Sequence, residues 1–141
     1  MKTLANLILK IHAVFLMVLT ATNTCMSLIG TFHNVGPYAW LHATPLVEAG
    51  LYQAYLILFL LAFLLFKQSK NPNPLVYNAI ALLVHGVAGS VNFIFRDSIQ
   101  SGGFDKLSSF SISLHTIWIC LELVAIISLY KRKNLLKYQI F

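Results

Sequence analysis

Four long apolar segments constrain what this chain can fold into. They lie at about residues 4–29, 45–66, 75–95 and 110–130 and cover most of the 141 residues. An α-helix needs about 20 apolar residues to cross roughly 30 Å of hydrocarbon, and each segment has that length. The sequence therefore predicts an all-α membrane protein, a four-transmembrane-helix antiparallel bundle.

Composition and length support this prediction. Hydrophobic residues make up 58% of the chain and charged residues only 10%, whereas a soluble domain carries about 25% charged residues. A chain of 141 residues has room for one domain. We therefore expect residues 1–141 to form a single transmembrane domain in contact with the lipid bilayer.

The basic residues predict an orientation. Lysine and arginine gather before the first segment or at its start, between the second and third, and after the fourth, whereas the loop between the first and second has neither. The positive-inside rule then places both termini in the cytoplasm. This bias accounts for the net charge of +6 without a nucleic-acid partner. The residues concerned are Lys2, Lys10, Lys67, Lys70, Lys131, Arg132, Lys133 and Lys137.

The first segment has a rival interpretation as a cleaved signal peptide. Lys2 precedes an apolar run, and small residues follow near Ala21. Lys10 and His12, however, interrupt the apolar core that such a peptide needs, and apolar residues continue to Ile29. A retained first helix is therefore favoured.

Two carboxylates lie inside the apolar segments. Thr44 as a cap and Pro45 as the first helical residue predict a helix start just before Glu48, where the helix dipole favours an acid. Ser108 or Ser109 is the predicted cap of the fourth segment, and Glu122 lies roughly 20 Å into this segment, counted from Ser108. A carboxylate there costs several kcal/mol unless it is neutralised or paired, and such residues usually face a bundle interior. Glu122 is thus the strongest functional candidate.

Helical spacing places other polar side chains on shared faces. In the fourth segment, His115, Trp118 and Glu122 are spaced by three and four residues and so share a face. His85 and Asn92 share a face of the third segment in the same way. We expect such faces to meet around a polar interior. The predicted ligand-binding or proton-handling residues are Glu48, Tyr52, His85, Asn92, His115, Trp118 and Glu122.

Depth along the helices constrains cofactors. Counting residues puts His12 in the inner third of the membrane, His85 near the middle and His115 in the outer third. A bis-histidine haem needs two opposed ligands at one level, so haem is disfavoured. A histidine near carboxylates can change charge near neutral pH and can hold the polar head of a quinone. The cofactor is otherwise unknown.

The loop between the first and second segments carries aromatic and histidine side chains. Tyr38 and Trp40 are typical of an interfacial aromatic belt. A metal site on the outer side is a minor alternative, because the loop histidines show no recognised ligand spacing. Its candidate ligands are His33, His42, Glu48 and His115.

Residues 46–89 resemble a known group of proteins. They read LVEAGLYQAYLILFLLAFLLFKQSKNPNPLVYNAIALLVHGVAG and combine an aromatic, aliphatic helix, a short Asn-Pro loop and His85 in the next helix. This combination resembles the small four-helix DoxX-like bacterial membrane proteins. The resemblance implies a four-helix fold and, through members linked to quinone-dependent sulfur oxidation, a connection to quinones. Only His85 matches a position associated with the group, so no catalytic residue is carried over.

The short loops leave no soluble catalytic domain, and no nucleotide fingerprint or serine nucleophile motif is present. We therefore favour an accessory subunit or a lipophilic-ligand-binding bundle of a bacterial inner (plasma) membrane, within a larger membrane complex or a homo-oligomer. One alternative is a quinone-linked membrane oxidoreductase subunit, in which Glu122, His115 and His85 handle protons. Another is a proton-coupled small transporter or channel.

Overall fold

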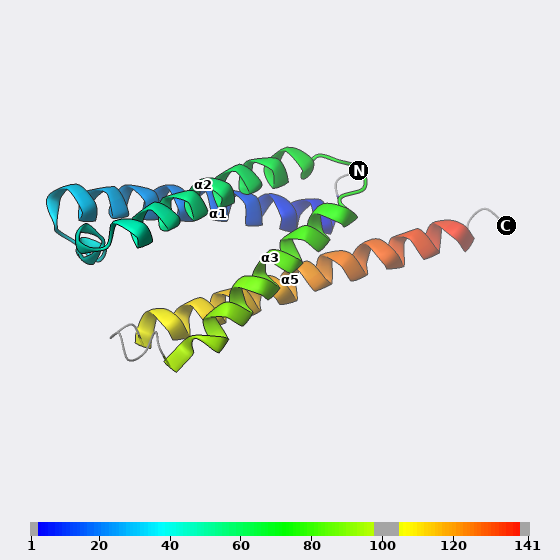
Figure 1. The fold of residues 1–141 in the computed structure, drawn as a ribbon. Coiled ribbons are helices and arrows are strands. Elements are labelled where there is room, and N and C mark those ends of the chain that lie inside the picture. The colour runs from blue at the N-terminus through cyan, green and yellow to red at the C-terminus, as the bar shows by residue number, and fades with distance from the viewer. Residues whose placement is uncertain (1–2, 98–104, 139–141) are drawn as a thin grey trace. The chain divides into compact units, whose positions relative to one another are not determined.

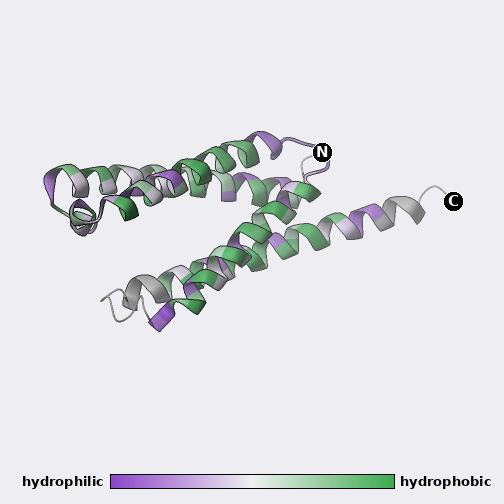
Figure 2. Ribbon diagram, in the orientation of Figure 1, coloured by the Kyte–Doolittle hydropathy of each residue, from purple (hydrophilic) through white to green (hydrophobic). Residues whose placement is uncertain are grey.

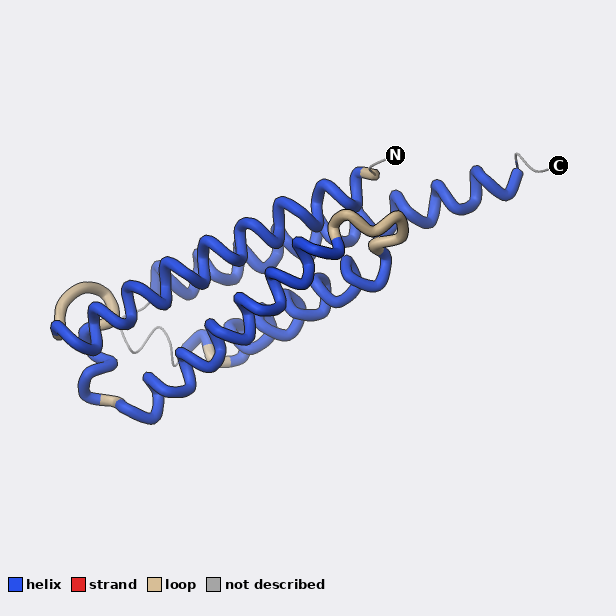
Figure 3. Tube along the Cα trace, turned by 90° about the horizontal axis from the view of Figure 1, so that it is seen from above, coloured by secondary structure: helices blue, strands red, loops and turns tan. Residues whose placement is uncertain are grey.

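The computed structural model describes residues 3–97 and 105–138, and side chains are described for residues 3–97 and 109–133. The four long helices confirm the all-α, four-helix prediction (Figure 1). Helix runs along nearly all of the described chain (Figure 3). The elements are α1 (Leu4–His33), the 3₁₀ helix η1 (Ala39–Ala43), α2 (Pro45–Gln68), α3 (Leu75–Ile94) and α5 (Asp105–Tyr138).

All four long helices have the length and hydropathy of membrane spans. The qualifying stretches are Leu4–His33, Pro45–Gln68, Leu75–Ile94 and Ser109–Lys133. Figure 2 shows apolar residues along each of these helices and more polar residues at the connections. Many large apolar side chains also lie on the outside, and Leu46, for example, is 90% exposed. Because apolar surface is unfavourable in water, these helices belong in contact with the lipid bilayer.

The chain divides into two compact units, described in turn. Residues 10–67 form one unit, and residues up to 9 together with residues from 68 onward form the other. The expectation of one domain stays a prediction.

A tight turn joins α1 to η1 in the unit of residues 10–67. The backbone amide of Asn34 donates to the carbonyl oxygen of Gly30 at 2.9 Å, and Asn34 has a φ of 51°. Asparagine tolerates this left-handed conformation at a helix end better than most residues do. Gly36, with a φ of 82°, then continues the turn. These two residues end α1 and reverse the chain toward α2.

The start of α2 follows the sequence only in part. The helix begins at Pro45, a residue that suits the first helical position. Glu48 lies in the first turn, and its amide donates to the carbonyl oxygen of Thr44 at 3.0 Å. The Thr44 hydroxyl, however, donates to the carbonyl oxygens of Trp40 and Leu41, each at 3.4 Å. The predicted side-chain cap by Thr44 is therefore wrong, because the preceding 3₁₀ turn engages this hydroxyl.

In the other unit, the start of α1 is tied to the loop that precedes α3. Asn6 is buried, and its Nδ2 atom donates to the carbonyl oxygens of Ser69 at 3.0 Å and Asn71 at 2.7 Å. Beside it, Ala5 and Ile8 form an apolar cluster with Ala125 of α5, against which Leu129 packs. The start of α1, the loop of residues 69–74 and the part of α5 near residue 129 thus lie at one end of this unit.

Replacing Asn6 by leucine should weaken this end of the protein. The substitution removes the amide donor from two backbone carbonyls and should lower the free energy of unfolding by about 1–3 kcal/mol. Thermal unfolding in detergent measures the effect. Leu7→Ala is the control, because the Leu7 side chain is exposed. Equal melting temperatures for Asn6→Leu and the unmodified protein would contradict the role given to Asn6.

Candidate functional site

The antiparallel pair α3 and α5 carries most of the predicted site residues. The two helices pack against each other, and Figure 1 shows them side by side. Near one end, Asn92 of α3 donates from Nδ2 to Oγ of Ser111 of α5 at 2.7 Å. Farther along, Gly89 allows a close approach: a Cβ atom built there would lie 3.2 Å from the Cβ atom of His115. Glycine at position 89 thus helps to bring His115 against α3.

His85 and His115 meet at this crossing. Their Nδ1 atoms lie 2.7 Å apart, a hydrogen-bond distance, and their rings are 5.0 Å apart at an angle of 51°. The ring of Trp118 also stacks on the ring of His85, with the ring centroids 6.0 Å apart and an angle of 14° between the ring planes. His85 is only 2% exposed and Trp118 is buried, whereas His115 is half-buried. Hydrogen bonding offsets the cost of removing polar ring atoms from water.

This contact corrects the depth estimate from the sequence. His85 and His115 were expected at different depths, but they lie at the same level. The reason is that α5 begins at Asp105 rather than at the predicted cap Ser108, since the chain has no glycine or proline after Gly103. His115 is then about 15 Å from the start of α5, and His85 is about 13.5 Å from the end of α3. The two histidines therefore lie at nearly the same distance from the neighbouring ends of α3 and α5.

The hydrogen bond between two Nδ1 atoms restricts the protonation of the pair. One Nδ1 atom must carry a proton and the other must accept it. If His115 accepts at Nδ1, its Nε2 atom carries a proton and is a donor; if neutral His115 donates at Nδ1, its Nε2 atom is an acceptor. Nε2 of His115 makes no hydrogen bond to any described residue. The pair can therefore present either a donor or an acceptor to a bound molecule.

A groove of about 470 Å³ lies along the same helix pair and is lined in part by His115. Two other polar lining residues are already engaged: Ser90 donates its hydroxyl to the carbonyl oxygen of Gly86 at 2.7 Å, and Thr116 donates to that of Ile112 at 2.9 Å. Their hydroxyl protons are thus used within α3 and α5, whereas Nε2 of His115 makes no hydrogen bond to a described residue. The groove is lined by Gly86, Gly89, Ser90, Phe93, Ile94, Ile112, His115, Thr116 and Ile119.

A second groove, of about 410 Å³, shares lining residues with the first. Both are lined by Gly86, Ser90 and Ile119, and the second adds only apolar side chains. Because glycine and serine are small, this part of α3 leaves room beside α5. The added lining residues are Leu82, Leu83, Val87 and Val91.

Two further polar residues of this unit are fully buried. Glu122 of α5 has no exposed surface. Asn78 of α3 is equally buried, and its Nδ2 atom donates to the carbonyl oxygen of Pro74 at 2.8 Å, which leaves Oδ1 without a hydrogen bond among the described residues. Buried carboxyl and amide groups are costly in lipid and usually serve a function or a specific contact.

The remaining predicted residues belong to the unit of residues 10–67. Glu48 is half-buried and makes no side-chain hydrogen bond or ion pair within the described residues. The hydroxyl of Tyr52 lies 3.2 Å from that of Thr31. His33 and His42 are exposed, and Nδ1 of His42 bonds to the carbonyl oxygen of Thr31 at 2.9 Å. Among the described residues, no three His, Cys, Asp or Glu side chains are grouped so as to hold a metal ion.

Sequence reasoning missed one polar cluster in this unit. The hydroxyl of Tyr38 donates to Oδ1 of Asn23 at 2.9 Å and lies 3.1 Å from the hydroxyl of Tyr55. The expected place of Tyr38 at a membrane interface stays a prediction. Asn23 and Tyr55 each lie on a helix face that already carries other polar or aromatic residues. Their facing positions were a usable signal, whereas the inward turn of Tyr38 depends on the loop conformation.

Comparison of the chain with known protein families, with curated proteins and with solved structures finds no match. The structure itself shows a small membrane protein with four spans and a hydrogen-bonded histidine pair. The resemblance to DoxX-like proteins stays a prediction from the sequence.

Proposed function

We propose that this protein binds a lipophilic molecule in the groove between α3 and α5 and that His115 holds the polar head of that molecule. The observation that carries the proposal is the combination of an apolar groove with one hydrogen-bonding atom, Nε2 of His115, that no described residue engages. An accessory subunit that holds such a ligand for a larger membrane complex would use the same groove.

The walls of the groove support a ligand that comes from the bilayer. The large apolar lining residues come from both helices and lie within the candidate membrane spans. They are Phe93 and Ile94 of α3 and Ile112 and Ile119 of α5. A volume of about 470 Å³ falls in the range of small-molecule sites, about 300–1,000 Å³. Phe93 is 68% exposed, so the groove borders the outside of the helix pair, where lipid-soluble molecules are available.

The histidine pair favours a quinone as the class of ligand. A quinone carbonyl accepts a hydrogen bond, whereas the hydroxyl of its reduced form can donate one. Nε2 of His115 is a donor when His85 donates across the 2.7 Å bond, and it is an acceptor when neutral His115 donates across that bond. One site can therefore bind both redox forms. Trp118 stacks on His85 and helps to hold its ring in the orientation that the pair needs.

Substitution of His115 by phenylalanine tests this proposal. Phenylalanine keeps an aromatic ring of similar size but removes both nitrogens, so a bound molecule loses its polar contact. We expect the amount of co-purified lipophilic ligand to fall by about twofold to tenfold, because a hydrogen bond contributes about 0.5–1.5 kcal/mol. Mass spectrometry of an organic extract of gently purified protein measures it, with added short-chain quinone as the probe.

Ser113→Ala is the matched control for this experiment. Ser113 is an exposed residue of α5 that does not line either groove, and its hydroxyl donates to the carbonyl oxygen of Ser109. It should retain the ligand as the unmodified protein does. If His115→Phe retains quinone equally well and is folded, His115 does not hold the ligand and the proposal fails.

A second candidate function is proton transfer through the same helix pair. Its supporting observation is the hydrogen bond between His85 and His115, which can pass a proton, on the helices that also carry the buried Glu122. In this function, Glu122→Gln should abolish proton flux into liposomes without affecting quinone retention. For either function we propose an orientation with both termini cytoplasmic, in a bacterial inner membrane, as the charge bias predicts.

A further inference from the structure

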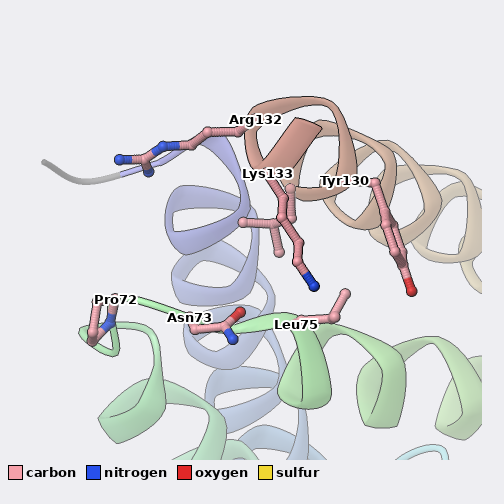
Figure 4. A pocket seen from close by; sticks show the side chains of 7 residues that line it. Pro72, Asn73, Leu75, Tyr130, Arg132 and Lys133 are labelled. Carbon is pink, nitrogen blue, oxygen red and sulfur yellow. The ribbon is translucent and has the colours of Figure 1, made fainter. Parts of the chain in front are cut away.

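A second kind of pocket lies at the other end of the α3–α5 pair. It has a volume of about 460 Å³ and is formed where α5 reaches the end of its apolar span and α3 begins (Figure 4). Its lining combines cationic, aromatic, amide and aliphatic side chains. These are Pro72, Asn73, Leu75, Leu129, Tyr130, Arg132 and Lys133. We call it the basic pocket.

The positive charge of the basic pocket is not neutralised within the described structure. Neither Arg132 nor Lys133 makes a hydrogen bond or an ion pair to a described residue. Acidic residues are scarce: the whole chain has four, against ten lysines and arginines. Two adjacent cations at a pocket attract an anion, and arginine in particular matches the oxygens of a phosphate group.

The place of the pocket along α5 suggests where the anion comes from. The apolar run of α5 ends at Tyr130, just before three consecutive basic residues, so Arg132 and Lys133 lie at the depth of the lipid headgroups. Figure 4 shows the Lys133 side chain extending from α5 toward the start of α3, where Leu75 lies. Tyr130 is an aromatic residue of the kind that anchors spans at the interface. Leu75 and Leu129 supply apolar surface for the glycerol and upper acyl region of a lipid.

We propose that the basic pocket binds the phosphate group of an anionic phospholipid from the surrounding membrane. Lys133, which extends toward the start of α3, contacts the phosphate, and the Asn73 side chain offers a hydrogen-bond donor. The exposed Arg132 side chain adds a second positive charge at the edge of the pocket. This site lies at the opposite end of the helix pair from Asn92 and Ser111, and it uses none of the residues that line the groove at His115. It is therefore independent of the function proposed above.

The test compares lipid binding of a double variant with that of a matched one. Arg132→Gln with Lys133→Gln removes both cations of the pocket. Lys67→Gln with Lys131→Gln removes the same number of charges from exposed positions near span ends that do not line the pocket. Native mass spectrometry then counts bound phosphatidylglycerol and phosphatidylcholine on each purified full-length protein. All four substituted side chains are exposed, so both variants should fold.

The unmodified protein should prefer phosphatidylglycerol to phosphatidylcholine. The pocket variant should lose this preference by about tenfold or more, and the matched variant should keep it within about twofold. Equal losses in both variants would overturn the proposal, because they would show general attraction by the charge of the protein. Release of bound phosphatidylglycerol by millimolar inorganic phosphate would also overturn it, since the site would then prefer a free anion to a lipid.

Discussion

Replacing Gly30 by alanine is expected to destabilise the connection between α1 and α2 strongly. A Cβ atom at this position would overlap the carbonyl oxygen of Tyr38 and would lie 2.5 Å from its carbonyl carbon. These are backbone atoms, so the loop itself must move. Overpacking of this kind typically costs about 1–3 kcal/mol and sometimes more. Thermal unfolding in detergent, followed by circular dichroism, should show a clearly lower melting temperature.

Gly50→Ala provides the control within the same unit. Gly50 lies inside α2 and is exposed, and an added Cβ atom would meet no other atom within 4 Å. Alanine has a higher helix propensity, so this variant should be as stable as the unmodified protein or more stable by up to about 1 kcal/mol. If both glycine variants melt at the same temperature, Gly30 and Tyr38 do not approach as closely as described.

Replacing Gly86 by leucine should abolish ligand retention without unfolding the protein. Gly86 lines both grooves on the α3–α5 pair, and a Cβ atom there would meet no atom within 4 Å. The backbone and helix packing can therefore accept a side chain, while its isobutyl group occupies the space assigned to the ligand. We expect at least about a tenfold loss of co-purified or added quinone, with a melting temperature close to that of the unmodified protein.

Val76→Leu is the control for the groove variant. Val76 is an exposed apolar residue of the same helix, but it lines neither groove. This variant should retain quinone fully. Full retention by Gly86→Leu as well would mean that the ligand, if bound, lies elsewhere on the protein.

The number of helices was predictable because it depends on local properties of the chain. Run length and hydropathy alone define a membrane span, and all four spans are present. The proline at position 45 marked the start of α2 for an equally local reason. The Thr44 hydroxyl could not be placed, since its bonds depend on the 3₁₀ turn before it.

The sequence predicted which helix face carries each residue of the candidate site, but it did not predict which of these faces meet. Spacing placed His85 on one helix face and His115 with Trp118 on another. Their meeting depends on the register between α3 and α5, which the start of α5 and the close approach at Gly89 determine. Hydropathy reports neither feature. Asn6, too, gave no periodic signal, because its partners are backbone carbonyls of a distant loop.

Nitrogen-15 NMR of histidine-labelled protein in detergent tests whether His85 and His115 form a pair that binds a ligand through Nε2 of His115. The pair should show one protonated and one unprotonated Nδ1 atom joined by a scalar coupling across the 2.7 Å hydrogen bond. Added short-chain quinone should shift the Nε2 resonance of His115, and Gly86→Leu should suppress that shift. Two uncoupled rings, with His115 unaffected by quinone, would contradict the account.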